Sequence, residues 1–327
     1  MARRTLRAAT RTSNLARTQT RLVGGLLHQT HVDIQLEFVE AVTSGDRVAD
    51  VAIAEIGTTG VFVKEVQAAV LEGRADIAVH SAKDLPSGPT QGLVIAAVPP
   101  RDDPRDALVG STLENVPTGG RIGTGSVRRR AQLAWMRPDL TFGNLRGNME
   151  TRLEKAGDFA AIMVAAAALR RLGRSTSMAE ILDVGRLVPQ AAQGALAIEC
   201  RADDEEMRAL LATIEDERSR RAVDAERAYL HELGGGCDLP VGAHAVAARE
   251  GGISLTGLIA TADGRIVLRH TDEHDDPVEL GRRVARHLLD NAGGSMVMEQ
   301  VAPSVPARPP ADPADPAEPA EPADAGP

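Results

Sequence analysis

The sequence has few aromatic residues, few cysteines and no long hydrophobic run. Its 327 residues include one Trp, one Tyr and four Phe, so any core must be built from aliphatic side chains and alanine. Two cysteines are too few for a disulfide framework. The longest apolar run, residues 159–169, falls short of the roughly 20 residues that span a bilayer, and the N-terminus has no signal-peptide core. These absences predict a cytoplasmic protein without a membrane partner.

Lysine is also scarce, with three lysines against 34 arginines, and the net charge is −9. An acidic balance argues against general nucleic-acid binding. The eight histidines show no ligand spacing, so we expect no metal site. A chain of this length can form two or three domains with cores of their own.

Short strands alternate with amphipathic helices over the first part of the chain, which predicts parallel sheets with crossover helices. The first βαβαβ unit runs to Asp84 and a second begins at Asp106. The spacing of Ser177 and Glu180 is that of a capping box and predicts a further short helix. The first predicted helix is amphipathic, is capped by Ser13 and carries Leu15, Gln19, Leu22 and Leu26.

Three domains and a tail are predicted from the composition. Pro99-Pro100 and the charged segment Arg101–Pro104 predict a hinge, and the chain crosses back near Leu187, so the first domain is discontinuous. A late helix followed by three strands predicts a small α+β domain, and Pro-Ala-acid repeats predict a disordered acidic tail. The predicted limits are 3–98 with 194–215 for domain 1, 101–190 for domain 2, 216–302 for domain 3 and 303–327 for the tail.

Lys83 and Asp84 come at the end of a predicted buried strand. The run Ala75–Val79 is apolar, and Pro86 ends the element. Open α/β sheets bind ligands at the carboxyl ends of their strands, so Asp84 is a candidate acid, base or stabiliser of a cation. The alternative is a surface ion pair in a turn.

Arginines gather between residues 121 and 152, where seven arginines accompany two acids. Arg130 and Arg137 fit a solvated face, whereas three others follow glycine-containing turns at helix starts, where anions are favoured: Arg128, Arg129 and Arg146. Because arginine pairs bidentately with carboxylates, the cluster indicates a ligand with several carboxylates. Phosphate is the alternative, although no Walker-type glycine-lysine signature is present.

The two cysteines have different settings. Cys200 lies in an apolar segment and is predicted to be a core residue. Cys237 follows three glycines, which predicts a flexible loop that exposes its thiol. This loop cysteine is either without a role or a covalent attachment point.

Six motifs, in chain order, resemble those of the porphobilinogen deaminase (hydroxymethylbilane synthase) family over about residues 3–300. They are Arg11-Thr12-Ser13-Asn14-Leu15-Ala16, Phe62-Val63-Lys64-Glu65, residues 75–86, Gly123-Thr124-Gly125-Ser126-Val127-Arg128-Arg129, Leu145-Arg146-Gly147-Asn148 and Gly235-Gly236-Cys237. The resemblance implies two α/β domains built like type II periplasmic binding proteins and a small α+β third domain. It also implies a monomeric transferase of tetrapyrrole and heme biosynthesis. Such an enzyme joins four porphobilinogens head to tail with release of ammonia and then frees hydroxymethylbilane by hydrolysis.

The resemblance further implies roles for individual residues. Asp84 matches the catalytic aspartate, and a carboxylate there can hold the pyrrole N–H and offset the charge of the cationic azafulvene that deamination leaves. Cys237 matches the residue that carries a dipyrromethane primer through a thioether. Residues around the primer are Ser81, Lys83, Thr124, Ser126, Arg128 and Arg129; residues that bind substrate are Arg11, Ser13, Gln19, Arg146, Arg152 and Arg171.

The chain departs from the family pattern at a few positions. The predicted lid at 43–60 ends in Gly57-Thr58-Thr59-Gly60 and lacks a usual lysine, with Glu55 upstream. Gly125 replaces a usual serine, and Ala168 replaces a usual glycine. A non-catalytic solute receptor on the same scaffold is the rival hypothesis, although a receptor would have no use for Asp84 or Cys237.

Overall fold

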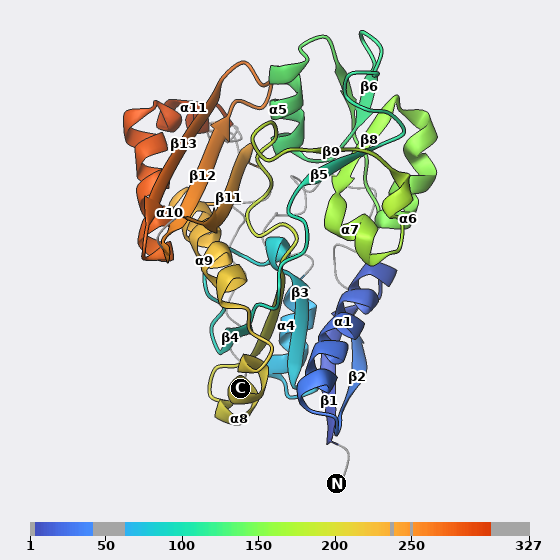
Figure 1. Cartoon of the computed structure of the whole chain (residues 1–327), viewed down its shortest axis with the longest axis vertical. Helices are drawn as coiled ribbons and strands as arrows, with labels where there is room; N and C mark the ends of the chain where they lie inside the picture. Colours follow the sequence, from blue (N-terminus) through green and yellow to red (C-terminus); the bar gives the residue numbers. More distant parts are fainter. Residues whose placement is uncertain (1–3, 42–62, 236–238, 249–250, 302–327) are drawn as a thin grey trace, which may run out of the picture.

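The structure is a computed structural model that describes residues 4–41, 63–235, 239–248 and 251–301. Within them the chain forms two five-stranded sheets and one three-stranded sheet, with helices packed against each (Figure 1). We refer to these three units as domains 1, 2 and 3. The predicted lid, Cys237 and the predicted tail lie outside the described residues. None of the described helices is long and apolar enough to cross a membrane.

Domain 1 has the strand order β2-β1-β3-β10-β4. Strand β1 pairs in parallel with β2 and β3, whereas β10 runs antiparallel to β3 and β4. Aliphatic residues such as Leu6, Ile77 and Ile198 form its core. The elements are β1 (Arg4–Arg11), α1 (Asn14–Thr30), β2 (Ile34–Ala41), α4 (Lys64–Leu71), β3 (Ile77–Ser81), a 3-10 turn (Ala82–Asp84), β4 (Leu93–Ala97), β10 (Leu196–Arg201) and α8 (Glu205–Ala212).

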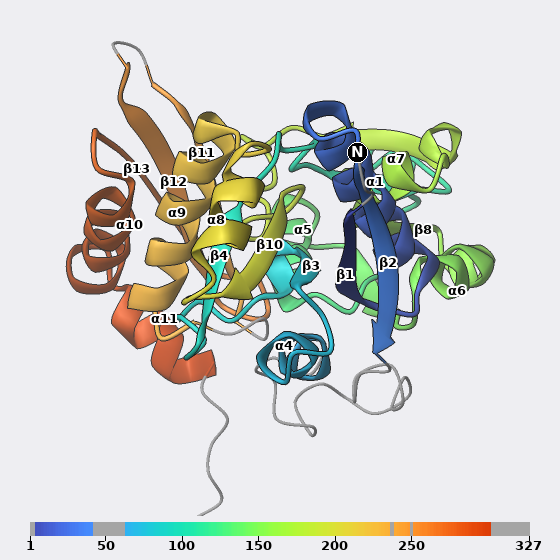
Figure 2. The same ribbon diagram turned by 90° about the horizontal axis from the view of Figure 1, so that it is seen from below.

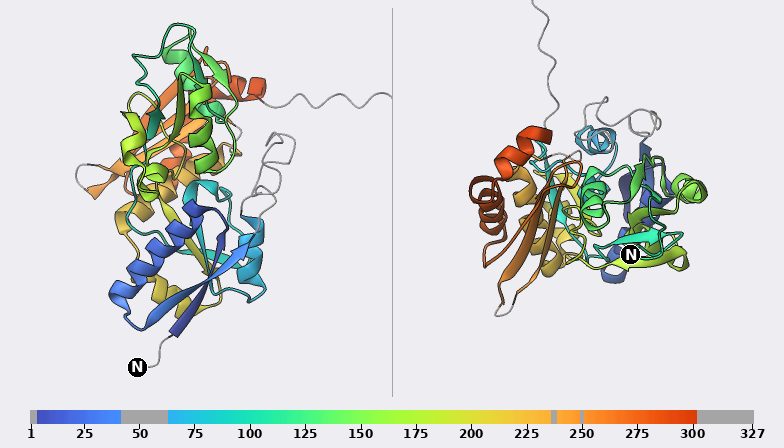
Figure 3. Two further views of the ribbon diagram at one scale, coloured as in Figure 1. Left: turned by 90° about the vertical axis from the view of Figure 1, so that its right-hand side faces the viewer. Right: turned by 90° about the horizontal axis from the view of Figure 1, so that it is seen from above.

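Domain 2 repeats this arrangement with the order β7-β6-β8-β5-β9. Strand β6 is parallel to β7 and β8, and β5 is antiparallel to β8 and β9. Figure 3 shows domains 1 and 2 as two lobes, one above the other in its left view. The elements are β5 (Asp106–Val109), β6 (Arg121–Gly123), α5 (Val127–Met136), β7 (Thr141–Gly143), α6 (Met149–Glu154), β8 (Ala161–Ala165), α7 (Ala166–Arg171) and β9 (Met178–Leu182).

Domain 3 is an antiparallel sheet, β11-β12-β13, with two long helices on one face. A Cβ at Gly257 would lie 2.7 Å from both Tyr229 of α9 and Val284 of α10, so both helices pack closely on that face. On the other face, Leu258 and Ala260 pack with Ala131 of α5 in domain 2; Figure 2 shows domain 3 beside the two lobes. The elements are α9 (Glu217–Glu232), β11 (Val241–Ala247), β12 (Ile253–Ala260), β13 (Val267–His274), α10 (Pro277–Arg286), a π-helical turn (His287–Asn291) and α11 (Gly294–Val301).

The antiparallel strands β5 and β10 are the first strands after the chain crosses between domains 1 and 2. The outgoing segment 98–105 and the returning segment 187–195 lie side by side, and the Asp102 amide donates to the Gly194 carbonyl at 3.2 Å. Gly194 has φ +87°, and a Cβ there would lie 2.5 Å from the Asp102 carbonyl oxygen, so only glycine fits. The predicted fold class, two α/β domains with a small α+β domain, is confirmed. The exact domain limits stay a prediction.

The face of α1 was predicted only in part. Gln19 is buried as expected, but Leu22 is 46% exposed, and the residues facing the domain 1 sheet follow the i, i+4 spacing of Gln19, Val23 and Leu27. Leu15 packs across the lobe boundary against the core of domain 2. Helix α1 therefore packs against both domains, which the single apolar stripe in the sequence did not distinguish.

Two further predictions were wrong. Residues 178–182 form strand β9 rather than a helix, because they pair with β5, as Leu182 does with Asp106; the ladder outweighs the local capping signal. Arg137 is not on a solvated face, since it donates to the carbonyls of Leu113 and Val116 and pairs with Asp139 at 2.6 Å.

Candidate functional site

A pocket at the carboxyl end of β3 holds Asp84. Neighbouring parallel strands β1 and β3 end at the same sheet edge, so Arg11 and Ser81 meet there. The amino end of α1 follows β1 directly, and the Ser13 hydroxyl caps it by accepting from the Ala16 amide at 3.3 Å. The pocket is lined by, among others, five residues predicted to form the site: Arg11, Ser13, Gln19, Ser81 and Asp84.

Asp84 lies on the 3-10 turn after β3 rather than on the strand itself. The turn keeps Leu85 and Ala82 buried and leaves the Asp84 side chain at the pocket wall. Gln19 and Ser81 exchange hydrogen bonds at 2.9 and 3.2 Å, which fixes the floor of the pocket beside it.

Lys83 is enclosed on the same turn and donates to the Gln193 side chain at 3.3 Å. Burial lowers the pKa of its ammonium group to about 8; Asp84 opposes the shift, and the positive charge of Arg129 adds to it. An ammonium group whose pKa falls this far has too little negative charge around it.

Arg152 and Arg146 bring positive charge from domain 2 to the same place. Burial lowers the pKa of Arg152 to about 10, and the neighbouring cations Arg129, Arg146 and Arg11 contribute to the shift while Asp84 opposes it. Charges from both lobes therefore meet at Asp84. The buried Nε of Arg146 has no hydrogen-bond partner within the described residues.

The turn that carries Arg146 requires a glycine. Gly147 has φ +107°, and a Cβ there would lie 2.8 Å from the Thr151 side chain. Asn148 then caps α6 by accepting from the Thr151 amide at 2.9 Å. The cap sets the start of the helix that presents Arg152, whose Nε donates to the Gly147 carbonyl at 2.9 Å.

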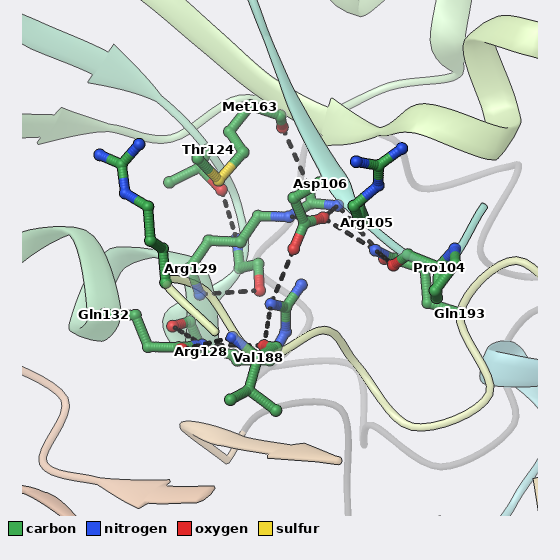
Figure 4. Close-up of polar contacts among 12 residues, drawn as sticks. Pro104, Arg105, Asp106, Thr124, Arg128, Arg129, Gln132, Met163, Val188 and Gln193 are labelled. Carbon is green, nitrogen blue, oxygen red and sulfur yellow. Dashed lines mark hydrogen bonds and ion pairs between the residues drawn. The ribbon is translucent and has the colours of Figure 1, made fainter. Parts of the chain in front are cut away.

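Arg128 and Arg129 share one buried carboxylate, Asp106 (Figure 4). The distances are 2.8 Å from Arg128 Nη1 and 2.7 Å from Arg129 Nη2, and Gln193 donates to the same carboxylate at 2.9 Å. Burial alone would raise the pKa of Asp106, but the two guanidinium groups hold it well below its usual range. Thr124 and Ser126 shape the preceding turn, Thr124 by accepting from the Ser126 amide and Ser126 as the cap of α5.

Three predicted site residues also have contacts outside the Asp84 pocket: Arg171, Ser126 and Arg128. Arg171 contacts the segments that link the two lobes, with its Nη2 donating to the Gly194 carbonyl at 2.6 Å. A second pocket, at the junction of domains 2 and 3, is lined by Ser126 and Arg128 together with Leu230 and Leu239.

Cys200 is a core residue, as predicted. It is fully buried in domain 1, and its Sγ donates to the Arg201 carbonyl at 3.4 Å. Burial, with a smaller contribution from Asp204, raises the pKa of its thiol to about 11. Such a thiol is a poor nucleophile at neutral pH.

Sequence reasoning missed three buried polar residues that organise the site and its surroundings: Asp106, Gln193 and Glu226. Each has partners far away in the sequence. Asp106 did have a recognisable signal, because it is a charged residue at the start of an apolar strand. A carboxylate buried with such a strand requires a partner that neutralises it.

A two-lobed α/β scaffold with one carboxylate among cations from both lobes defines a protein that acts on a small anionic molecule. Residues 6–209 match the family model for porphobilinogen deaminase, dipyromethane cofactor binding domain, and residues 220–290 match that for porphobilinogen deaminase, C-terminal domain. The chain belongs to the porphobilinogen deaminase family.

Individual relatives agree with this assignment. Porphobilinogen deaminase of Brevibacillus brevis is 43% identical over 298 residues, which cover 90% of this chain and 96% of the relative. That of Roseiflexus sp. is 44% identical over 302 residues, covering 90% and 99%. Among solved structures, the methionine binding protein MetQ aligns with 66% of this chain and 92% of its own, at 8% identity and with a TM-score of 0.41.

Proposed function

We propose that the chain is a porphobilinogen deaminase that joins four porphobilinogens head to tail and releases hydroxymethylbilane. The observation that carries the proposal is the meeting of Asp84 with cations from both lobes, Arg11 from domain 1 and Arg146 and Arg152 from domain 2. Porphobilinogen is a pyrrole with an acetate and a propionate side chain. A site that binds porphobilinogen must therefore supply several arginines that pair with carboxylates, together with one group that stabilises positive charge.

Each residue of the pocket has a distinct task in this proposal. The guanidinium groups of Arg11, Arg146 and Arg152 bind the side-chain carboxylates and hold the ring in place. The Ser13 hydroxyl and the Gln19 amide line the pocket wall and add hydrogen bonds. Asp84 accepts the pyrrole N–H and stabilises the positive charge that develops as ammonia leaves the substrate.

The residues beside this pocket fit a dipyrromethane group. Lys83 lacks sufficient negative charge, and the buried Nε of Arg128 has no hydrogen-bond partner within the described residues. Both features suit the carboxylates of a pyrrole pair, with Arg129, Thr124, Ser126 and Ser81 completing the set. When bound, the group supplies the pyrrole end to which the first substrate unit is joined.

Cys237 is the proposed attachment residue. The sequence has two cysteines, and the burial and raised thiol pKa of Cys200 argue against that residue. The substrate is a small molecule, and we further propose that the protein acts as a monomer in the cytoplasm.

Intact mass of the denatured protein tests the proposal. Wild-type protein and Cys200→Ala should both carry the extra mass of two pyrrole units, give the acidic aldehyde colour of linked pyrroles and consume porphobilinogen. Cys237→Ala should lack the mass, the colour and the activity, since the alanine side chain has no nucleophilic atom that could form the thioether. An unmodified and inactive wild-type protein from a host that makes the primer would favour the solute-receptor hypothesis instead.

A further inference from the structure

Two neighbouring arginines at the end of α7 hold both segments that link domains 1 and 2. Arg171 donates to the Gly194 carbonyl at 2.6 Å, and its Nε lies 3.6 Å from Asp102 Oδ2. Arg170 pairs with Asp103 at 2.9 Å and lies 3.6 Å from Asp102. Asp102 and Asp103 belong to the outgoing segment and Gly194 to the returning one. A single short helix of domain 2 therefore clamps the predicted hinge.

The Arg171 guanidinium has little negative charge around it. Its side chain is 7% exposed, and burial lowers its pKa while Asp102 opposes the shift. At 3.6 Å, Asp102 is beyond hydrogen-bond distance. A guanidinium has five N–H donors, and within the described residues one of them makes a hydrogen bond. A buried cation in this state favours a further anion.

Asp102 can release Arg171 at little cost. Its side chain is 25% exposed and therefore reaches water, and it keeps Arg170 nearby. A carboxylate that approaches Arg171 would form the bidentate pair that Asp102 does not form. This new pair would also compete with the hydrogen bond from Arg171 to the Gly194 carbonyl.

We propose that Asp102 is a positioning residue that competes with ligand carboxylates for Arg171 and so couples ligand binding to the hinge. The proposal rests on the proposed function for the nature of the ligand, an acetate or propionate of a pyrrole. Without such a carboxylate, Arg171 holds the two linking segments together. With it, Arg171 turns to the ligand and no longer bridges Asp102 and Gly194, so the segments are held only by their direct bonds, such as that of the Asp102 amide to the Gly194 carbonyl.

The test compares Asp102→Asn with Asp103→Asn in the primer-carrying protein. Asp102→Asn keeps the size and removes the competing charge, so the KM for porphobilinogen should fall about two- to fivefold, the effect of one partly exposed ion pair. Amide hydrogen exchange in segments 99–105 and 190–195 should become faster. Asp103→Asn breaks the pairs with Arg170 and Arg105 but leaves Arg171 in place. Its exchange should also become faster while its KM stays unchanged, and Asp102→Glu should restore the wild-type KM.

An unchanged KM in Asp102→Asn, or an equal fall in Asp103→Asn, would overturn the proposal while the deaminase function stands. A wild-type protein that consumes no porphobilinogen would overturn the proposed function instead. In that case the exchange data still decide about the hinge, because unchanged exchange in Asp102→Asn shows that Asp102 and Arg171 do not hold the two segments together.

Discussion

Asp84 stands among more positive than negative charge, which suits a group that must stabilise a transient cation without being neutralised by a permanent partner. The charge of Asp84 opposes the lowering of the pKa of both Arg152 and Lys83. Within the described residues, however, Asp84 makes no hydrogen bond with either of them. Its oxygens therefore remain available to a ligand. In the proposed mechanism, the cations around Asp84 bind the carboxylates of that ligand, and Asp84 contacts the pyrrole ring.

Replacing Asp84 by Asn should lower kcat by about two to three orders of magnitude, as the loss of one preorganised electrostatic group does in other enzymes. Asn has the same size, so the melting temperature should change little. The matched control is Asp139→Asn, which removes a half-buried carboxylate paired with Arg137 away from the site and should keep normal turnover. Near-normal kcat in Asp84→Asn would remove the centre of the proposed mechanism.

Lys83 should make stability depend on pH in the primer-free protein. Its pKa is about 8 in the folded state against 10.5 for the ordinary side chain, so between these values the folded state binds fewer protons than the unfolded state. The free energy of unfolding therefore rises with pH through this window. At pH 7 the buried charge destabilises the fold, and Lys83→Met should be more stable than the primer-free protein by about 3 kcal/mol.

Urea unfolding in the Cys237→Ala background from pH 7 to 9.5 checks this expectation. The advantage of Lys83→Met should shrink steadily above pH 8. An advantage that stays constant over the range would show that Lys83 keeps its charge, and the cluster would then contain more negative charge than the described residues supply.

At the scale of elements, helix α5 carries its functional residues inward rather than toward solvent. Ser126 caps it, and the next turn places Arg128 and Arg129 against Asp106, while Arg130 is exposed and donates to the Ala262 carbonyl at 3.3 Å. The helix thus links the candidate site to the turn that follows β12 in domain 3. Three successive arginines have two different surroundings.

Arg128→Leu and Arg130→Leu should therefore differ in stability. Breaking a buried ion pair typically costs about 3–5 kcal/mol, and Arg128→Leu should fall at the low end because Arg129 still neutralises Asp106. Arg130→Leu should cost roughly 0–1 kcal/mol, as at other exposed positions. The free energy of unfolding in urea measures both, and equal losses would contradict the buried-cluster interpretation.

The sequence predicted local signals well and long-range partners poorly. The cap at Ser13 was recognisable because it acts within the first turn of its own helix. The inner face of α1 and strand β9 were not, since they depend on which surface packs against them. The family motifs predicted which side chains meet around Asp84. For Asp106 the local sequence could suggest burial, but it could not name the partners, which lie 22 and 87 residues away.

At the scale of the whole molecule, one carboxylate joins all three domains. Glu226 of α9 is fully buried and accepts two hydrogen bonds from Arg101 of the outgoing segment, at 2.7 and 3.0 Å. It also accepts the amides of Ala192 in the returning segment and Ala245 in β11. Ala192 has φ +60°, a conformation that alanine rarely adopts, so the bond to Glu226 helps to hold a strained link.

Glu226→Gln should destabilise the protein by about 3–5 kcal/mol, because it leaves Arg101, whose side chain is 10% exposed, without its counter-charge. The control lies on the same helix: Glu232 pairs with Arg286 at the surface at 2.8 Å, so Glu232→Gln should cost roughly 0–1 kcal/mol. Urea unfolding gives the two values. Hydrogen exchange then locates the damage, which should spread from α9 into segments 99–105 and 190–195, because Glu226 bonds to both links. A loss confined to domain 3 would mean that the remaining contacts of the links, such as those of Gln193 with Arg101 and Pro104, hold them without Glu226.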